Sequence, residues 1–116
     1  MVNTLRFDVE QFQFDENDDV IEELPLYTIS SDYTENNKEV FTLLSSTIWH
    51  TINLGNVSNG NLLKLRSTGL INVKFNGGTQ IFEDVDEVIL KCTITGLQIQ
   101  NNSGDEVTIT KEIFGD

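Results

Sequence analysis

Asp15, Asn17 and Asp19 place oxygen-bearing side chains at every second position of an acidic segment. This spacing matches positions 1, 3 and 5 of a calcium-binding EF-hand loop, whose oxygens converge on one cation. The pattern then departs from that loop, because Val20 stands where it needs glycine and Leu26 where it needs a bidentate glutamate. The segment therefore predicts a solvated acidic turn, with Asp15, Asn17 and Asp19 kept as candidate metal ligands.

A second group of carboxylates, Glu83, Asp84, Asp86 and Glu87, follows an acid-free stretch of the chain. Asp84 and Asp86 fall on one side of an extended strand, and paired carboxylates serve acid–base chemistry in glycosidases. Acidic residues between strands more commonly belong to turns and keep a protein in solution. We predict no catalytic residue here and no enzymatic activity for the chain, with a second divalent-cation site as the alternative.

The single histidine and the single cysteine both lie in apolar patterns. His50 shares a predicted strand face with isoleucine and leucine, which is typical of a histidine at the rim of a core. Cys92 alternates with Leu90 and Ile94, so it is predicted to be a small buried hydrophobic residue. A zinc site would need carboxylates to complete its ligands, and a cysteine–histidine nucleophilic pair stays open. We expect no cofactor.

Trp49 falls on the strand face opposite His50, together with Thr51 and Asn53. Strict alternation would expose this large aromatic side chain. An exposed tryptophan serves as an interface anchor or as a stacking platform for a sugar. A second sheet or the N-terminal segment could also bury it in the core. Of these three interpretations we favour the interface, followed by the core and then the sugar site.

Acidic residues are distributed unevenly along the chain. Residues 1–39 carry eleven of the nineteen, residues 40–82 carry none, and acids return from Glu83. The acid-free block contains Lys64, Arg66 and Lys74, which we predict as interface residues. They would meet the acidic N-terminal third of a neighbouring copy, head to tail, in a ring or trimer. The alternative is that both regions pair within one subunit or face water.

The net charge of −12 at pH 7 excludes several partners. It opposes binding to nucleic acid, which depends on lysine and arginine, and docking on anionic lipid. A single cysteine cannot form an internal disulfide, so nothing points to an oxidising compartment. The sequence start lacks the apolar core of a signal peptide, and no run approaches the 20 or so apolar residues of a membrane span. We expect a soluble protein made in a cytoplasm.

Short apolar alternations separated by turn residues dominate the 116 residues. They predict an all-β, antiparallel sandwich or jelly roll of about 7–9 short strands. We expect one domain over residues 1–116, with residues 1–38 either an acidic, less regular N-terminal arm or part of the same sandwich. Five features are predicted locally: a bulge or a bend between Val9 and Phe12, a loop over 30–38, a strand over 47–54, a turn over 67–69 and a hairpin turn over 76–78.

Two segments of the second half resemble a known class of protein. They read LLKLRSTGLINVKFNGG over residues 62–78 and ITGLQIQNNSG over residues 94–104. This succession of strands and turns is similar to the C-terminal part of small bacteriophage virion proteins. The resemblance implies a structural component of the head, neck or tail, which is usually a symmetric oligomer. The motif contains no functional residues, and the acidic N-terminal third lies outside it.

The sequence and this resemblance together predict a non-enzymatic assembly protein located in the virion and synthesised in the host cytoplasm. It would form a homo-oligomer and contact other virion proteins through Trp49, Lys64, Arg66 and Lys74. The alternative is a small carbohydrate-binding β-sandwich module, in a calcium-dependent or calcium-independent form, with Trp49 as its stacking platform.

Overall fold

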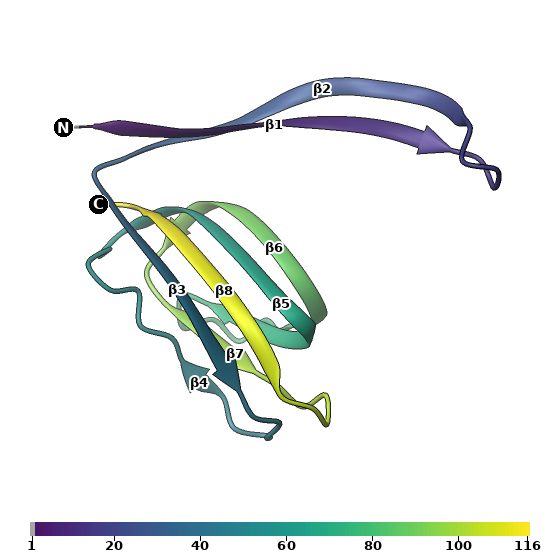
Figure 1. Ribbon diagram of the computed structural model, residues 1–116. Helices are drawn as coiled ribbons and strands as arrows, with labels where there is room; N and C mark the ends of the chain where they lie inside the picture. Colours follow the sequence, from purple (N-terminus) through teal and green to yellow (C-terminus); the bar gives the residue numbers. More distant parts are fainter. Residues whose placement is uncertain (1) are drawn as a thin grey trace.

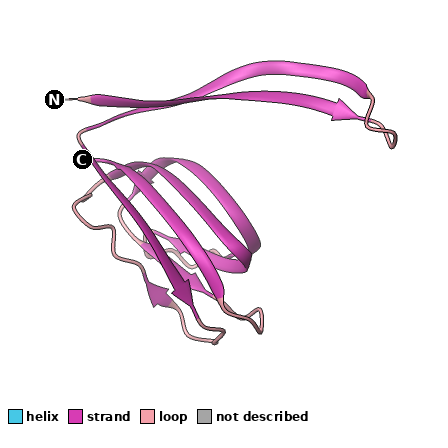
Figure 2. Ribbon diagram, viewed as in Figure 1, coloured by secondary structure: helices cyan, strands magenta, loops and turns pink. Residues whose placement is uncertain are grey.

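The computed structural model describes residues 2–116, without the side chain of Ile21, and these residues form eight strands and no helix. The described residues thus contain no helix that could cross a membrane. Figure 2 shows the strands and their connecting loops. The strands are β1 (Asn3–Phe14), β2 (Val20–Tyr33), β3 (Glu35–Leu43), β4 (His50–Thr51), β5 (Gly60–Phe75), β6 (Phe82–Ile94), β7 (Leu97–Gln100) and β8 (Val107–Gly115). All pairings are antiparallel, which confirms the predicted all-β, sandwich-like class.

The long strand β5 joins two layers of the body (Figure 1). Its first part, Gly60–Ser67, pairs with β8, and β8 pairs with the edge strand β3. Its last part, Asn72–Phe75, pairs instead with β7, which pairs with β4. Strand β6 follows the other edge of β5 along both parts. The sheet therefore folds over at the middle of β5 and encloses the core between its two halves.

The turn predicted at residues 67–69 corresponds to the bend in the middle of β5. The strand is continuous there, but the side-chain oxygen of Ser67 accepts the Gly69 N–H and the Thr68 hydroxyl accepts the N–H of Thr108. Side-chain acceptors of this kind replace ladder partners where a strand bends. The result is a 16-residue strand in place of two short ones.

The core consists of β-branched and leucine side chains from the inner faces of both layers. Alternation along β5 and β8 places one side chain in every two inside, which is the period seen in the sequence. The most deeply buried of them are Leu63, Leu65, Ile71, Val73, Ile94, Leu97, Ile99, Ile109 and Ile113. A single continuous core of this kind is what a body of about 80 residues can build.

Strands β1 and β2 pair only with each other and form a hairpin that we call the arm (Asn3–Tyr33). Figure 1 shows the arm crossing one end of the body, with its turn end projecting beyond it. The predicted irregularity lies in the ladder between Val9 and Gln11, where Pro25 and Leu26 of β2 oppose the single residue Glu10. Proline is tolerated at such a bulge because it has no N–H to donate.

The predicted loop over residues 30–38 is wrong, because all of these residues except Thr34 belong to β2 or β3. Strand β2 continues to Tyr33, and β3 begins at Glu35 after a single connecting residue, Thr34. Thr34 donates its N–H to the carbonyl of Gly115, which fixes the junction to the end of β8. The polar composition of residues 30–38 favours a loop. These residues nevertheless pair in the β1–β2 and β3–β8 ladders, whose backbone hydrogen bonds do not require apolar side chains.

The predicted strand over residues 47–54 is wrong except for the two residues of β4. Ser46 accepts the Ile48 N–H through its hydroxyl, and Asn53 accepts the Gly55 N–H through its side-chain oxygen. These local hydrogen bonds compete with a sheet ladder. Alternation therefore fails before β4, and Ile48 is exposed instead of facing the core.

The predicted hairpin turn over residues 76–78 connects β5 to β6. Asn76 and Gly77 both have positive φ angles, of 55° and 67°, and Gly78 donates its N–H to the carbonyl of Phe75. These are the features of a type I′ turn, which asparagine followed by glycine favours.

Candidate functional site

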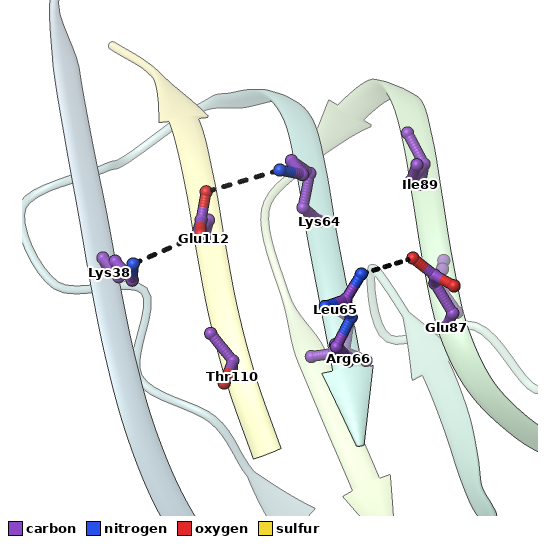
Figure 3. Close-up of a pocket in the computed structure, with 9 residues that line it drawn as sticks. Lys38, Lys64, Leu65, Arg66, Glu87, Ile89, Thr110 and Glu112 are labelled. Carbon is purple, nitrogen blue, oxygen red and sulfur yellow. Dashed lines mark hydrogen bonds and ion pairs between the residues drawn. The ribbon is translucent and has the colours of Figure 1, made fainter. Parts of the chain in front are cut away.

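A shallow groove of about 270 Å³ crosses the outer face of the layer formed by β3, β8, β5 and β6 (Figure 3). Three cations line it: Lys64 and Arg66, which alternate outward along β5, and Lys38 from β3. The exposed side chain of Ile89 lies on the β6 side. We call this feature the basic groove. Its position follows from the register, which sets these outward-facing side chains of neighbouring strands side by side.

Two carboxylates also lie in the basic groove and pair with its cations. Glu112 is shared between Lys38 at 3.6 Å and Lys64 at 3.8 Å, and Glu87 meets Arg66 at 3.2 Å. The first two distances are long for ion pairs, and the cationic side chains stay 40–75% exposed. Exposed pairs of this kind contribute about 0–1 kcal/mol each. Three cations against two carboxylates leave one positive charge in excess.

Lys64 and Arg66, two of the four predicted interface residues, lie in this one groove, and both have ion-pair partners within the chain. Those partners are C-terminal acids, Glu87 and Glu112, and not the acidic N-terminal third. Lys38 was missed because its segment was predicted to be a loop. The pairing of Lys38 with Glu112 across β3 and β8 becomes visible only once the register is known.

The other two predicted interface residues form a separate pair on the second layer. The Lys74 ammonium lies 4.1 Å from the centroid of the Trp49 ring, a cation–π contact. Lys74 stands in the last part of β5, and Trp49 directly precedes β4. Trp49 is half-buried and not fully exposed. It precedes β4, so the alternation of side chains along that strand does not set its orientation. A sugar could stack only on the ring face that Lys74 leaves free.

Among its described residues the arm exposes five large apolar side chains, and its apolar surface changes face along its length. Near the body, Leu5, Phe7 and Val9 point to one half-buried face. Beyond the Pro25 bulge, Phe12 and Phe14 point to the opposite face, where their exposed fractions are 43% and 54%. The cross-strand partner of Phe14 is Val20, and that of Phe12 is Glu23. Further exposed apolar residues of the arm are Leu26 and Tyr27.

The polar face of the arm near the body is held together by a hydrogen-bonded ladder. Asp8 accepts the Thr28 hydroxyl at 2.6 Å and the Arg6 guanidinium at 3.3 Å, and Asp32 accepts the Thr4 hydroxyl at 2.7 Å. The Thr28 hydroxyl, followed by Arg6, holds the pKa of the Asp8 carboxyl below its ordinary value of 3.8. Cross-strand pairs of this kind stabilise an isolated hairpin.

We expect Thr28→Val to raise the pKa of Asp8 towards 3.8, because the hydroxyl that stabilises the carboxylate is lost. Because the Asp8 pKa is lower in the folded chain than its ordinary value, the ionised carboxylate stabilises the fold at pH values above that ordinary pKa. This stability is lost as the pH falls through the lowered pKa. A carboxyl-detected NMR titration measures the pKa directly. Thr4→Val, which touches Asp32 instead, is the control and should leave Asp8 unchanged.

The acidic turn at the tip of the arm is closed by its own backbone. One Asp15 carboxylate oxygen accepts the N–H groups of Asn17 and Asp19, at 2.8 and 3.0 Å. Within the described part of the chain, no three histidine, cysteine, aspartate or glutamate side chains converge as metal ligands. Asp15, Asn17 and Asp19 thus lie in one exposed turn, in which the Asp15 carboxylate accepts hydrogen bonds from the backbone.

The remaining sequence candidates, Asp84, Asp86, His50 and Cys92, lie outside the basic groove. Asp84 and Asp86 are both exposed on β6, and Asp84 sits at a bulge with a φ of 54°. His50 is half-buried in β4 opposite Ile99, as expected at the rim of a core. The prediction that Cys92 is buried is wrong, because its thiol is exposed.

The reason for the exposed thiol is another bulge in β6. Between Gly60 and Leu62 of β5, the partner strand β6 advances by three residues and not by two, so Cys92 and Thr93 oppose a single residue. Such a bulge breaks the alternation on which the prediction rested. Cys92 consequently lines a shallow cleft between β6 and the base of the arm, with Ser30, Asp32 and Lys91.

Comparison of this chain with protein-family models, with curated proteins and with solved structures gave no match.

Proposed function

We propose that this chain is a non-enzymatic assembly protein of a bacteriophage particle and that the arm makes its contacts with other protein subunits. The observation that carries this proposal is the apolar surface that Phe12, Phe14, Val20 and Leu26 expose on a hairpin extending from the body. The resemblance of residues 62–104 to small virion proteins supports the setting in a phage particle.

An isolated two-stranded hairpin is only marginally stable in water, because it has no second layer to cover its apolar face. The base of the arm has such cover. Tyr33 packs edge-on against Phe114 of β8 at 5.0 Å between ring centroids, and Phe7 lies under the Lys64 ammonium at 5.6 Å. Beyond the bulge, Phe12, Phe14 and Val20 are 43–56% exposed. A partner protein that covers them would order the outer part of the arm.

The energies involved are sufficient for assembly. Full burial of a phenylalanine side chain is worth about 1.5–3 kcal/mol, and Phe12 and Phe14 have roughly half of this still to gain. Every 1.4 kcal/mol changes a dissociation constant about tenfold. Exposed aromatic residues are also the kind that dominate binding energy at interfaces. The high negative charge keeps unassembled subunits in solution.

We expect the chain to self-associate in a concentration-dependent manner, and Phe12→Ser/Phe14→Ser to raise the dissociation constant at least about tenfold. Size-exclusion chromatography with light scattering over a range of concentrations measures this. Ile48→Ser removes an exposed apolar side chain from the segment before β4, outside the arm and the basic groove, and is the matched control, with association close to that of the unmodified chain. A chain that stays monomeric at high concentration and low salt would contradict the proposal.

A further inference from the structure

We propose that the basic groove of one copy is the receptor for the arm of a second copy. This inference rests on the proposed function, since it assumes that the arm binds protein, and it adds the identity of the partner and the residues on both sides. The contact would be head to tail: the outer half of one arm, with Phe12, Phe14 and Glu23, would lie on Lys38, Lys64 and Arg66 of the next subunit.

The charges of the two surfaces are complementary. Residues 15–23, at the outer end of the arm, contain six carboxylates, and no lysine or arginine occurs between Arg6 and Lys38. The basic groove has three of the seven cations of the chain and one positive charge in excess. The long ion pairs to Glu112 and the exposure of Lys38 and Arg66 leave N–H donors free for another carboxylate. Lysine and arginine facing acids across an interface raise its specificity and association rate.

The apolar parts of the two surfaces also correspond. On the outer half of the arm, Phe12 and Phe14 share a face with Glu23, which is the cross-strand partner of Phe12. In the basic groove, Ile89 is 44% exposed beside the cations, and Val88 contributes to the lining. An aromatic side chain with an adjacent carboxylate therefore faces an aliphatic side chain with adjacent ammonium and guanidinium groups. This combination of an apolar centre and charged periphery is the usual composition of protein interfaces.

Geometry excludes the arm of the same molecule as the occupant. The base of each arm already lies beside its own basic groove, since Phe7 is 5.6 Å from the Lys64 ammonium. Phe14 lies seven positions along the strand from Phe7, which corresponds to roughly 23 Å at about 3.3 Å per residue. The paired strand cannot fold back on itself over that length. The outer half of the arm can therefore reach only the basic groove of another molecule.

A contact of this type uses different surfaces on the two partners, so each subunit offers one arm and one basic groove. Heterologous contacts of this kind close into a ring when the rotation permits and otherwise extend as a filament. The uneven distribution of charge along the sequence would then reflect the two sides of one repeated interface.

We expect Arg66→Glu to raise the self-dissociation constant at least about tenfold, because it replaces an attractive charge by a repulsive one. Lys74→Glu changes the net charge equally but lies by Trp49, away from the basic groove, and should change the constant less than about threefold. Association should weaken as salt rises, because exposed charges are screened. Light scattering measures all three, and circular dichroism checks that each variant is folded.

Mixing gives the sharpest test. Arg66→Glu has an intact arm and an impaired basic groove, whereas Phe12→Ser/Phe14→Ser has an impaired arm and an intact basic groove. Each alone should be monomeric, and their mixture should form a 1:1 complex that does not grow further. Equal effects of Arg66→Glu and Lys74→Glu, or no complex in the mixture, would overturn the inference while leaving an arm-dependent association intact. A monomeric unmodified chain would overturn the proposed function as well.

Discussion

Gly115→Ala is expected to destabilise the chain by more than about 3 kcal/mol, one of the largest effects of any single substitution here. A Cβ atom at this position would lie 2.0 Å from the Asn59 carbonyl oxygen and 2.8 Å from the Cα of Gly60. Both neighbours are backbone atoms, so no side-chain rotation can relieve the clash. The ladder from Gly60 to Gly115 must open to admit the methyl group.

The same place also anchors the junction with the arm. The carbonyl of Gly115 accepts the N–H of Thr34, and Asp116 exchanges backbone hydrogen bonds with the segment before β5. Displacing Gly115 would therefore disturb three elements at once: the end of β8, the start of β5 and the base of the arm. The loss of buried hydrogen bonds adds to the steric cost.

Urea-induced unfolding followed by tryptophan fluorescence gives the free energy of unfolding for this test. Gly77→Ala is the control, because a Cβ atom there meets nothing within 4 Å and the cost is confined to its positive φ of 67°. That backbone conformation costs an alanine about 1–2 kcal/mol. If the two substitutions prove equally costly, the close approach of Gly115 to Asn59 is not a constraint on the fold.

Local features of this chain could be predicted from sequence wherever a short segment determines its own structure. Asn76 followed by Gly77 fixes a left-handed turn because of its own backbone preferences, and Asp15 closes its turn with its own carboxylate. Alternation identified the inward-facing residues of β5, β7 and β8, since a period of two follows directly from strand geometry. These inferences need no knowledge of which strands are neighbours.

Features that depend on strand pairing could not be obtained in this way. The bulge that exposes Cys92 exists only because β6 advances by one extra residue along β5. The change of partner in the middle of β5 depends on β7 and β8 meeting the same strand from one side. A sequence reveals the period of one strand but not the register between two.

The candidate site shows the same division. Lys64 and Arg66 could be predicted because they are basic residues of the acid-free block, whereas Lys38 enters the basic groove only through the register of β3 with β8. The change of apolar face along the arm follows from spacing within β1, because Phe12 comes three residues after Val9 and therefore points to the opposite face. The extra residue of β2 at Pro25 and Leu26 becomes visible only in the pairing of the two strands. Trp49 and Lys74 come together because β7 pairs with β5 on one side and with β4 on the other, and no local pattern in the sequence shows this.

Lys111 is the most unusual residue of the core. It lies between Ile109 and Ile113 on the inner face of β8 and is fully buried. Its ammonium donates hydrogen bonds to the Asn53 carbonyl and to the Glu39 carboxylate, the latter at 3.3 Å. The aliphatic stem of the lysine fills core volume, while its charged end ties the irregular segment after β4 to the sheet. A buried cation is tolerated only with such partners.

We expect Lys111→Ala to destabilise the chain by about 3–5 kcal/mol, because it creates a cavity and leaves the Asn53 carbonyl without its donor. Lys111→Met retains most of the stem, so it should lose only the hydrogen bonds, about 1–2 kcal/mol. The difference between the two separates packing from charge. Glu39→Gln keeps an acceptor on a side chain that is half exposed and should cost about 1 kcal/mol. Urea unfolding of the three variants measures these free energies, and a Lys111→Met variant as unstable as Lys111→Ala would show that the ammonium, and not the stem, holds the segment after β4 in place.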